Sequence, residues 1–296
     1  LHRGRAGGHE KLYQRENIFI TLANLMSGWV VGLVLVSALM HAGWNFLVKR
    51  GGDGQMDTVL FAIGCSFIAA VLLPFSSPLD PACYPWLMVT LVVHVAYFLT
   101  LAAAYQHADL SLAYPVMRGF APVLVAFFAV FSGETLNSYQ ILGIACIAFG
   151  ILLPAFIGKP WQNMKGFYFA ILNAAIIALY TVLDGVGVRL SGNAIAYTLW
   201  LFLFNSWGIL GILIWRRSLS QVLSSARSGW RIALVGAGLS MGSYGIVLWA
   251  MTQTAIPAVA ALREISVVFA AFLGAWFLKE SVGLWRILGA SLVGLG

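Results

Sequence analysis

Long apolar runs separated by short polar connections make up most of this chain. Each α-helix that crosses a bilayer needs roughly 20 apolar residues, and ten runs are candidates for such helices. They lie at residues 29–48, 57–75, 85–105, 110–132, 138–158, 166–188, 194–215, 230–252, 256–278 and 283–296. The runs are too long and too uniformly apolar for the alternating strands of a membrane barrel. The pattern therefore predicts an all-α polytopic membrane protein with ten transmembrane helices.

The two halves of the chain carry the same succession of landmarks. These are a buried arginine, an acidic turn and an Ile-Leu-Gly helix start: Arg118, Glu134 and Gly143, then Arg263, Glu280 and Gly289. Arginine and glutamate are 16 residues apart in the first copy and 17 in the second, and glutamate and glycine are nine apart in both. Five spans per copy force the copies into opposite orientations, as in secondary transporters with a midplane binding site. We therefore expect two inverted five-helix repeats, at 26–158 (spans 1–5) and 159–296 (spans 6–10).

Both ends of the chain depart from this pattern. Residues 1–25 are polar and basic, and Met26 leads directly into the first apolar run. We expect residues 1–25 to be a leader that is either not native to the protein or disordered. The last apolar run is short, so we expect the tenth span to be truncated.

The fourth run contains an arginine, which costs roughly 3 kcal/mol at membrane depth on insertion scales. Arg118 lies beside Gly119 and between Pro115 and Pro122. A span that tolerates these residues is expected to face a protein-lined, watered interior rather than lipid. The second copy has only Pro257, near its start. We therefore expect the fourth span to be the more distorted of the two.

Composition excludes several classes of protein. Only 9% of residues are charged and 61% are hydrophobic, whereas soluble domains carry about 25% charged residues. The net charge of +7 comes mostly from Lys and Arg in the connections, so no nucleic-acid partner is indicated. The three cysteines, Cys65, Cys83 and Cys146, have no metal-ligand spacing, and we expect neither a metal nor a cofactor.

Three stretches carry a resemblance to a known family. They are His41-Ala42-Gly43-Trp44-Asn45, the segment Asp109–Pro115 that leads to Arg118-Gly119, and Leu278-Lys279-Glu280. The chain resembles the EamA-type transporters of the drug/metabolite transporter superfamily from Met26 to its end. The resemblance implies a basket of ten helices in which helices 1, 3, 4, 6, 8 and 9 line a central cavity and helices 5 and 10 lie outside. It also implies that Arg118 and Arg263 face that cavity, but it does not name a substrate.

The candidate substrate-binding residues are two arginines with nearby aromatic and amide side chains. They are Arg118, Arg263, Trp44, Asn45, Tyr97, Tyr114, Tyr180 and Tyr244. The planar guanidinium of arginine suits a carboxylate or phosphate, so the arginines either bind an anionic group of the substrate or pair with an acidic residue in the empty site. The alternative is structural: each satisfies loose carbonyls at a kink or extends to the membrane interface.

Four further residues are candidates for coupling or proton relay: Asp184, His41, His94 and Glu264. Asp184 either carries a proton or a cation, or forms a static bridge to one of the arginines. The histidines either relay protons or pack through hydrogen bonds. Glu264 lies on a different helix face from Arg263, which predicts a partner on another helix. Glu134 and Glu280 are expected to cap the helices that follow them.

These patterns predict a secondary transporter rather than an enzyme, because no catalytic motif or ATP-binding domain is present. We expect it to move a small organic metabolite, amino-acid-like, sugar-like or drug-like, across the inner (cytoplasmic) membrane by alternating access, with proton coupling or exchange. The alternatives are a flippase for a lipid-linked sugar and a membrane receptor or enzyme without transport. A monomer and a homodimer both remain open.

Overall fold

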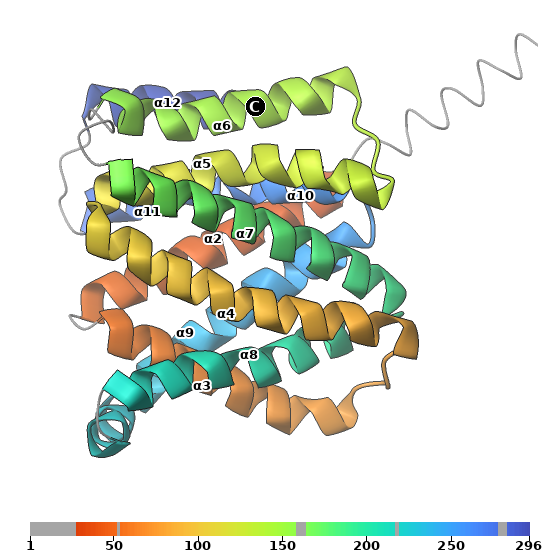
Figure 1. The fold of residues 1–296 in the computed structure, drawn as a ribbon, viewed down its shortest axis with the longest axis vertical. Helices are drawn as coiled ribbons and strands as arrows, with labels where there is room; N and C mark the ends of the chain where they lie inside the picture. Colours follow the sequence, from red (N-terminus) through yellow and green to blue (C-terminus); the bar gives the residue numbers. More distant parts are fainter. Residues whose placement is uncertain (1–27, 52–53, 158–163, 217–218, 278–282) are drawn as a thin grey trace, which may run out of the picture.

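The computed structural model describes residues 28–51, 54–157, 164–216, 219–277 and 283–296, and within these ranges the chain is helical with no strand (Figure 1). The first half contains α2 (Gly28–Gly51), α3 (Gly54–Leu72), α4 (Tyr84–His107), α5 (Leu110–Ala129) and α6 (Ser138–Ile157). The second half contains α7 (Met164–Leu190), α8 (Ala194–Arg216), α9 (Leu219–Met251), α10 (Ile256–Arg263), α11 (Ser266–Phe277) and α12 (Leu284–Leu295). Short 3-10 turns stand at η1 (Leu73–Phe75), η2 (Pro81–Cys83) and η3 (Val130–Ser132). The expected leader at residues 1–25 lies outside the described residues.

Eight of the ten predicted spans are long and apolar enough to cross a membrane in the described part of the chain. The ninth of the predicted spans is the joint segment Ile256–Phe277, made of α10 and α11. The seventh and tenth predicted spans, α8 and α12, are not among the eight, and α12 has only 12 residues. The protein is therefore a multi-pass helical membrane protein, and the count of ten crossings remains a prediction.

The eighth helix is longer than its apolar pattern indicates. The predicted runs at 194–215 and 230–252 leave a polar connection between them, but α9 already begins at Leu219. Only Gly229–Met251 is apolar enough to span the membrane. The Ser- and Arg-containing first part also includes Leu, Gln and Ala, which are good to moderate helix formers, so the helix continues where the hydropathy pattern ends.

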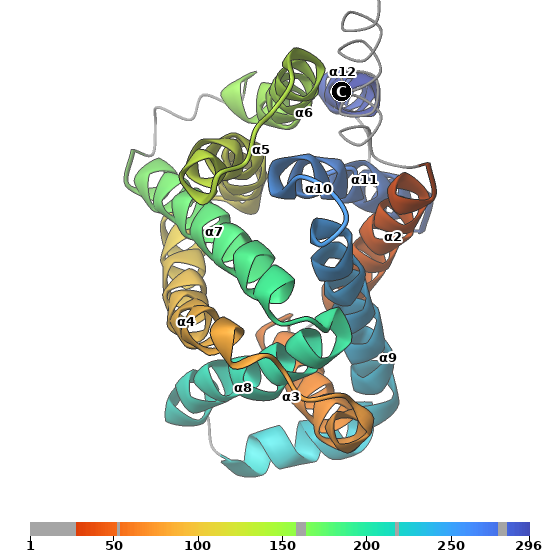
Figure 2. The same ribbon diagram turned by 90° about the vertical axis from the view of Figure 1, so that its right-hand side faces the viewer.

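The helices of the two halves pack in corresponding pairs. Helix α4 packs against α7 as α9 packs against α2, and α5 packs against α7 as α11 packs against α2. Helices α3 and α8 also contact each other. Seen along the helices, these elements surround a central axis, and α6 and α12 lie together outside them at one end (Figure 2). This is the placement that the family resemblance implies for the fifth and tenth spans.

The contact between α6 and α12 is symmetric: two glycines of α6 meet two glycines of α12 and its C-cap in equivalent ways. A Cβ at Gly150 would lie 2.7 Å from the carbonyl oxygen of Gly289, and a Cβ at Gly143 would lie 2.6 Å from that of Gly296. The alignment that matches Gly143 with Gly289 also matches Gly150 with Gly296. The two close approaches are therefore the same contact seen from each repeat, and only glycine allows the backbones so near.

The expectation that the fourth span would be the more distorted is wrong. Helix α5 runs unbroken through Pro115 and Pro122, whereas the ninth span is interrupted between α10 and α11. There, Glu264 N and Ile265 N donate to the carbonyls three residues back, Ala261 O and Leu262 O. Each proline removes one backbone bond, but α6, α7 and α10 pack along α5 and keep it a single helix. The tightened turn coincides instead with the adjacent charged residues Arg263 and Glu264.

Candidate substrate-binding site

A buried ion pair joins the two repeats near the centre of the fold. Arg118 comes from the middle of α5, and Glu264 from the turn between α10 and α11. The Arg118 Nε and Glu264 Oε2 atoms are 2.9 Å apart, and the two side chains are only 9% and 6% exposed. Glu264 thus has its partner on another helix, as its position in the sequence predicted.

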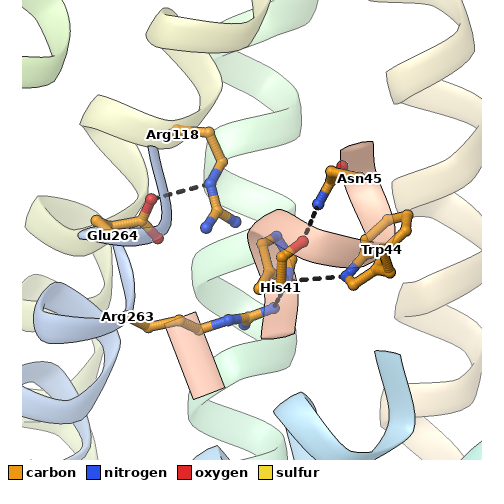
Figure 3. A network of polar contacts seen from close by, with 6 residues as sticks. All are labelled: His41, Trp44, Asn45, Arg118, Arg263 and Glu264. Carbon is orange, nitrogen blue, oxygen red and sulfur yellow. Dashed lines mark hydrogen bonds and ion pairs between the residues drawn. The ribbon is translucent and has the colours of Figure 1, made fainter. Parts of the chain in front are cut away.

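Arg263, at the end of α10, reaches toward α2. Its Nη2 lies 3.4 Å from His41 Nδ1, and its guanidinium stands 5.1 Å from the centre of the Tyr244 ring. Trp44 Nε1 approaches the same His41 nitrogen at 3.2 Å (Figure 3). Arginine and tryptophan side chains only donate hydrogen bonds, so Nδ1 accepts both, and a neutral His41 carries its proton on Nε2.

Asn45 completes this part of the network, but through a local contact. Its Nδ2 donates to the backbone oxygen of His41 at 2.8 Å, within the same helix. Figure 3 shows five of the predicted side chains close together with Glu264: Arg118, Arg263, His41, Trp44 and Asn45.

The hydrogen-bonding capacity of this network is not filled. Arg118 Nη2 and Arg263 Nε are buried and have no hydrogen-bond partner within the described residues. Arg118 Nε and Glu264 Oε2 also lack one, because their contact satisfies the distance of an ion pair but not the angles of a hydrogen bond. An unfilled buried donor costs about 1–3 kcal/mol, and more when it is charged. These buried donors are therefore available to a polar group of a bound molecule.

The space beside these groups is small in this conformation. A cavity of about 10 Å³, roughly the room for one water molecule, is bounded by residues of both repeats. They are Arg118, Ala121, Pro122, Val125, Ile177, Thr181, Val247, Met251, Ala260, Arg263 and Glu264. A larger cavity of about 260 Å³ lies elsewhere, at the helix ends around Arg189 and Thr252–Ala255. We place the candidate site at the smaller cavity, because the buried charges are there.

Asp184 lies in α7 and is fully buried. The hydroxyl of Tyr244 donates to its Oδ2 at 2.6 Å, and that of Tyr197 to its Oδ1 at 3.2 Å. Within the described residues no ion pair joins Asp184 to Arg118 or Arg263, so the alternative of a static bridge is not formed. Tyr244 instead links the two parts of the site, since its hydroxyl binds Asp184 and its ring faces Arg263.

The other predicted aromatic residues come from α4, α5 and α7, the helices beside this site. His94 Nδ1 is 2.9 Å from the Thr90 carbonyl oxygen of its own helix, and its ring lies 4.3 Å from that of Tyr180. Tyr97 meets Tyr180 edge-on at 5.6 Å. Tyr114 lies one helical turn before Arg118, on the same side of α5. In the described part of the chain no cluster of His, Cys, Asp and Glu is placed to hold a metal ion.

Sequence reasoning missed Tyr197. Tyr197 is the fourth residue of the seventh apolar run and belongs to no recognised motif. Only the fold brings it to Asp184.

Sequence reasoning also missed the role of Arg189 at the end of α7. Its Nε donates to Met251 O at 2.7 Å, its Nη2 donates to Thr254 O at 2.8 Å, and its Nη1 pairs with Glu134. In the sequence, Arg189 is the only lysine or arginine in the connections that follow the second, fourth, sixth and eighth predicted spans, and this isolation was the available signal.

The expectation that Glu134 caps α6 is accordingly wrong. Asn137 caps α6 instead. Its Oδ1 accepts from Gln140 N at 2.9 Å, and Gln140 Oε1 accepts from Asn137 N at 3.0 Å. This reciprocal pair is a capping box. Glu134 is then left free to pair with Arg189 across the repeats. Glu280, its counterpart, lies outside the described residues.

Comparison with known proteins supplies the family. No curated protein matches the chain. A crystal structure of another protein aligns with 90% of this chain and 94% of its own, with a TM-score of 0.67 and 14% sequence identity. At that identity the likeness shows the fold alone. The profile of the EamA-like transporter family matches residues 28–155 and again residues 164–296, so this chain belongs to the EamA-like transporter family.

Proposed function

We propose that the protein is a secondary transporter that moves a small organic metabolite across the cytoplasmic membrane by alternating access. The observation that supports this most is the buried polar network around Arg118. One repeat contributes Arg118 and the other contributes Arg263 and Glu264, as expected of a site between repeats near the bilayer centre. Buried ionisable groups at membrane depth are commonly functional.

The repeat architecture supports alternating access. If each repeat crosses the membrane five times, the second copy is inverted, and the symmetric contact between α6 and α12 is what such a pair produces. Rocking of one repeat against the other then exposes the central network to each side in turn. The tightened turn between α10 and α11 places Glu264 where such a movement breaks its contact with Arg118.

The walls of the site favour an organic molecule over a bare ion. Aromatic rings from three helices surround the charges, at Tyr97, Tyr180 and Tyr244. Asp184, beside them, is the group that we assign to proton coupling, since its carboxylate is held by neutral hydroxyls. Exchange of one metabolite for another is the alternative driving force.

The test is transport by the purified protein in proteoliposomes. A thermal-shift screen across amino acids, sugars, phosphonates and amines selects a ligand, and counterflow of that ligand is then measured. We expect Arg118→Ala and Arg263→Ala to abolish counterflow while the protein remains monodisperse. Wild-type rates of counterflow in both variants would show that Arg118 and Arg263 do not form the substrate-binding site. Scrambling of a lipid-linked sugar without counterflow of any soluble ligand would favour the flippase.

A further inference from the structure

The charges around the small central cavity do not balance locally. Two guanidinium groups, those of Arg118 and Arg263, face the space beside a single contacting carboxylate, Glu264 (Figure 3). The histidine in contact with them, His41, accepts hydrogen bonds and so adds no positive charge in its neutral form. Asp184 offsets the total charge from further away, but its carboxylate oxygens receive the hydroxyls of Tyr197 and Tyr244. It therefore leaves the arginine donors unfilled.

These donors are buried, and they belong to two arginines that line the same cavity. Arg118 is 7% exposed and Arg263 is 9% exposed, and Arg118 Nη2 and Arg263 Nε have no partner in the described part of the chain. Both arginines line the same cavity. Guanidinium groups bind planar oxyanions with two parallel hydrogen bonds, and the contact with Glu264 uses only Arg118 Nε. An oxyanion between the two arginines would fill the donors that Glu264 does not reach.

Glu264 occupies part of the position that such an oxyanion needs. The remaining cavity, about 10 Å³, cannot admit an organic molecule, since ligand pockets usually measure about 300–1,000 Å³. Space at the arginines therefore requires the Glu264 side chain to leave. Glu264 stands on the tightened turn between two helices rather than inside one, so a change in that turn moves it away from Arg118.

We propose that the transported molecule carries an oxyanion, a carboxylate or a phosphonate-like group, which binds Arg118 and Arg263 in exchange for Glu264. This rests on the proposed transport function and names the substrate class for it. Glu264 is an internal counterion: it neutralises Arg118 in the empty carrier and competes with the substrate. The anion in the site and Glu264 at Arg118 exclude one another.

Thermal-shift titration of the purified full chain with matched probes tests this. The probes are phenylacetate against phenylacetamide, succinate against succinamide, and phenylphosphonate against benzamide. We expect at least one acid to stabilise the protein while its neutral partner does not. Comparing the carboxylate probes with the phosphonate probe shows which of the two kinds of oxyanion the site binds. We expect Glu264→Gln to bind the active acid about tenfold more tightly, because it removes the competitor and leaves the shape unchanged.

Matched variants keep the result interpretable. Arg118→Gln and Arg263→Gln should lose the response to the acid, and Arg118→Gln/Glu264→Gln replaces the pair by neutral groups if the single variant fails to fold. Arg231→Gln makes the same change at an exposed arginine of α9 and should respond like the wild type. The proposal is overturned if amides stabilise as well as acids, if Glu264→Gln weakens binding, or if no acid shifts Glu264→Gln.

Counterflow in proteoliposomes separates this proposal from the transport function. If the protein carries a neutral solute in counterflow, and Arg118→Gln carries it at the same rate, the transport function is supported and the anion site is contradicted. If an acid binds through both arginines but the folded wild type shows no counterflow of that acid, the anion site is supported and the transport function is contradicted.

Discussion

Among the described residues, two arginine–glutamate pairs connect the repeats, and they differ in how completely each arginine is bound. Arg189 has three partners, namely Glu134 and the carbonyl oxygens of Met251 and Thr254, and its side chain is 35% exposed. Within the part of the chain that the structure describes, the contact of Arg118 is the side-on one with Glu264, and its side chain is 9% exposed. The more deeply buried arginine is therefore the less well satisfied one.

This difference separates a structural pair from a binding pair. Exposed or fully hydrogen-bonded arginines need no further partner, whereas a buried guanidinium with free donors is costly to keep. Arg189 ties the end of α7 to the turn before α10 at the edge of the fold. Arg118 keeps its free donors at the centre, where a substrate can use them. The free donors, rather than the presence of an ion pair, distinguish the candidate site.

The largest expected effect comes from exchanging the charges of the central pair. Arg118→Glu/Glu264→Arg restores the ion pair but moves the guanidinium to the other helix. We expect the variant to fold and its counterflow to fall at least about 100-fold, because the substrate loses its charged contact with the guanidinium on α5, and losing a buried charge contact costs about 2–5 kcal/mol. Counterflow with a size-exclusion check measures this. Retention of half the wild-type rate would mean that the pair is structural, like that of Arg189.

The next effect is on stability alone. Arg189→Gln removes the contact with Glu134 and weakens two bonds to carbonyl oxygens, a loss of about 2 kcal/mol. We expect the melting temperature to fall by about 5 °C, while the dissociation constant of the selected ligand stays within about twofold of the wild type. Thermal melting with and without ligand measures both quantities. A tenfold weaker ligand would show that Arg189 also belongs to the site.

Tyr244→Phe tests the link between the two parts of the site. It removes the hydroxyl that donates to Asp184 at 2.6 Å but keeps the ring that faces Arg263. We expect counterflow to slow about fivefold, since one such hydrogen bond contributes about 1 kcal/mol. Tyr197→Phe removes the longer bond, at 3.2 Å, and should slow it less. The opposite order of the two variants would contradict this arrangement.

The smallest effect is expected at Arg231, an exposed arginine of α9 that stands 5.4 Å from the Trp230 ring. Arg231→Gln should leave both melting temperature and counterflow within measurement error, because surface substitutions change stability by about 0.5 kcal/mol or less. A marked loss would show that removal of any arginine impairs the protein. The variants at Arg118 would then say nothing specific about the site.

The helix boundaries show how far hydropathy reaches as a predictor. The starts of α5, α6, α8 and α10 coincide with the predicted starts of their runs, because apolar length decides where a chain can cross a bilayer. The polar beginning of α9 was not predicted, since a helix outside the membrane has no apolar signal. The bend in the ninth span was also missed, because proline content pointed to the wrong helix.

Among the candidate residues, the sequence could indicate which ones matter but not which partners they bind. The arginines could be singled out because a charge in an apolar run is costly wherever it lies. Their partners could not be assigned, since Glu264 and Tyr197 reach Arg118 and Asp184 only through the packing of distant helices. The choice of Glu134 as a cap failed for the same reason, because local spacing cannot reveal a partner on another repeat.

By itself, the sequence determined that this chain is a duplicated helical membrane protein with an arginine in each copy, because apolar length, charge cost and repeat spacing are properties of neighbouring residues. The tertiary structure alone decided that Arg118 meets Glu264 while Arg189 meets Glu134. Which arginine keeps free donors depends on the few ångströms between side chains of different helices, and spacing along the chain carries no record of those distances.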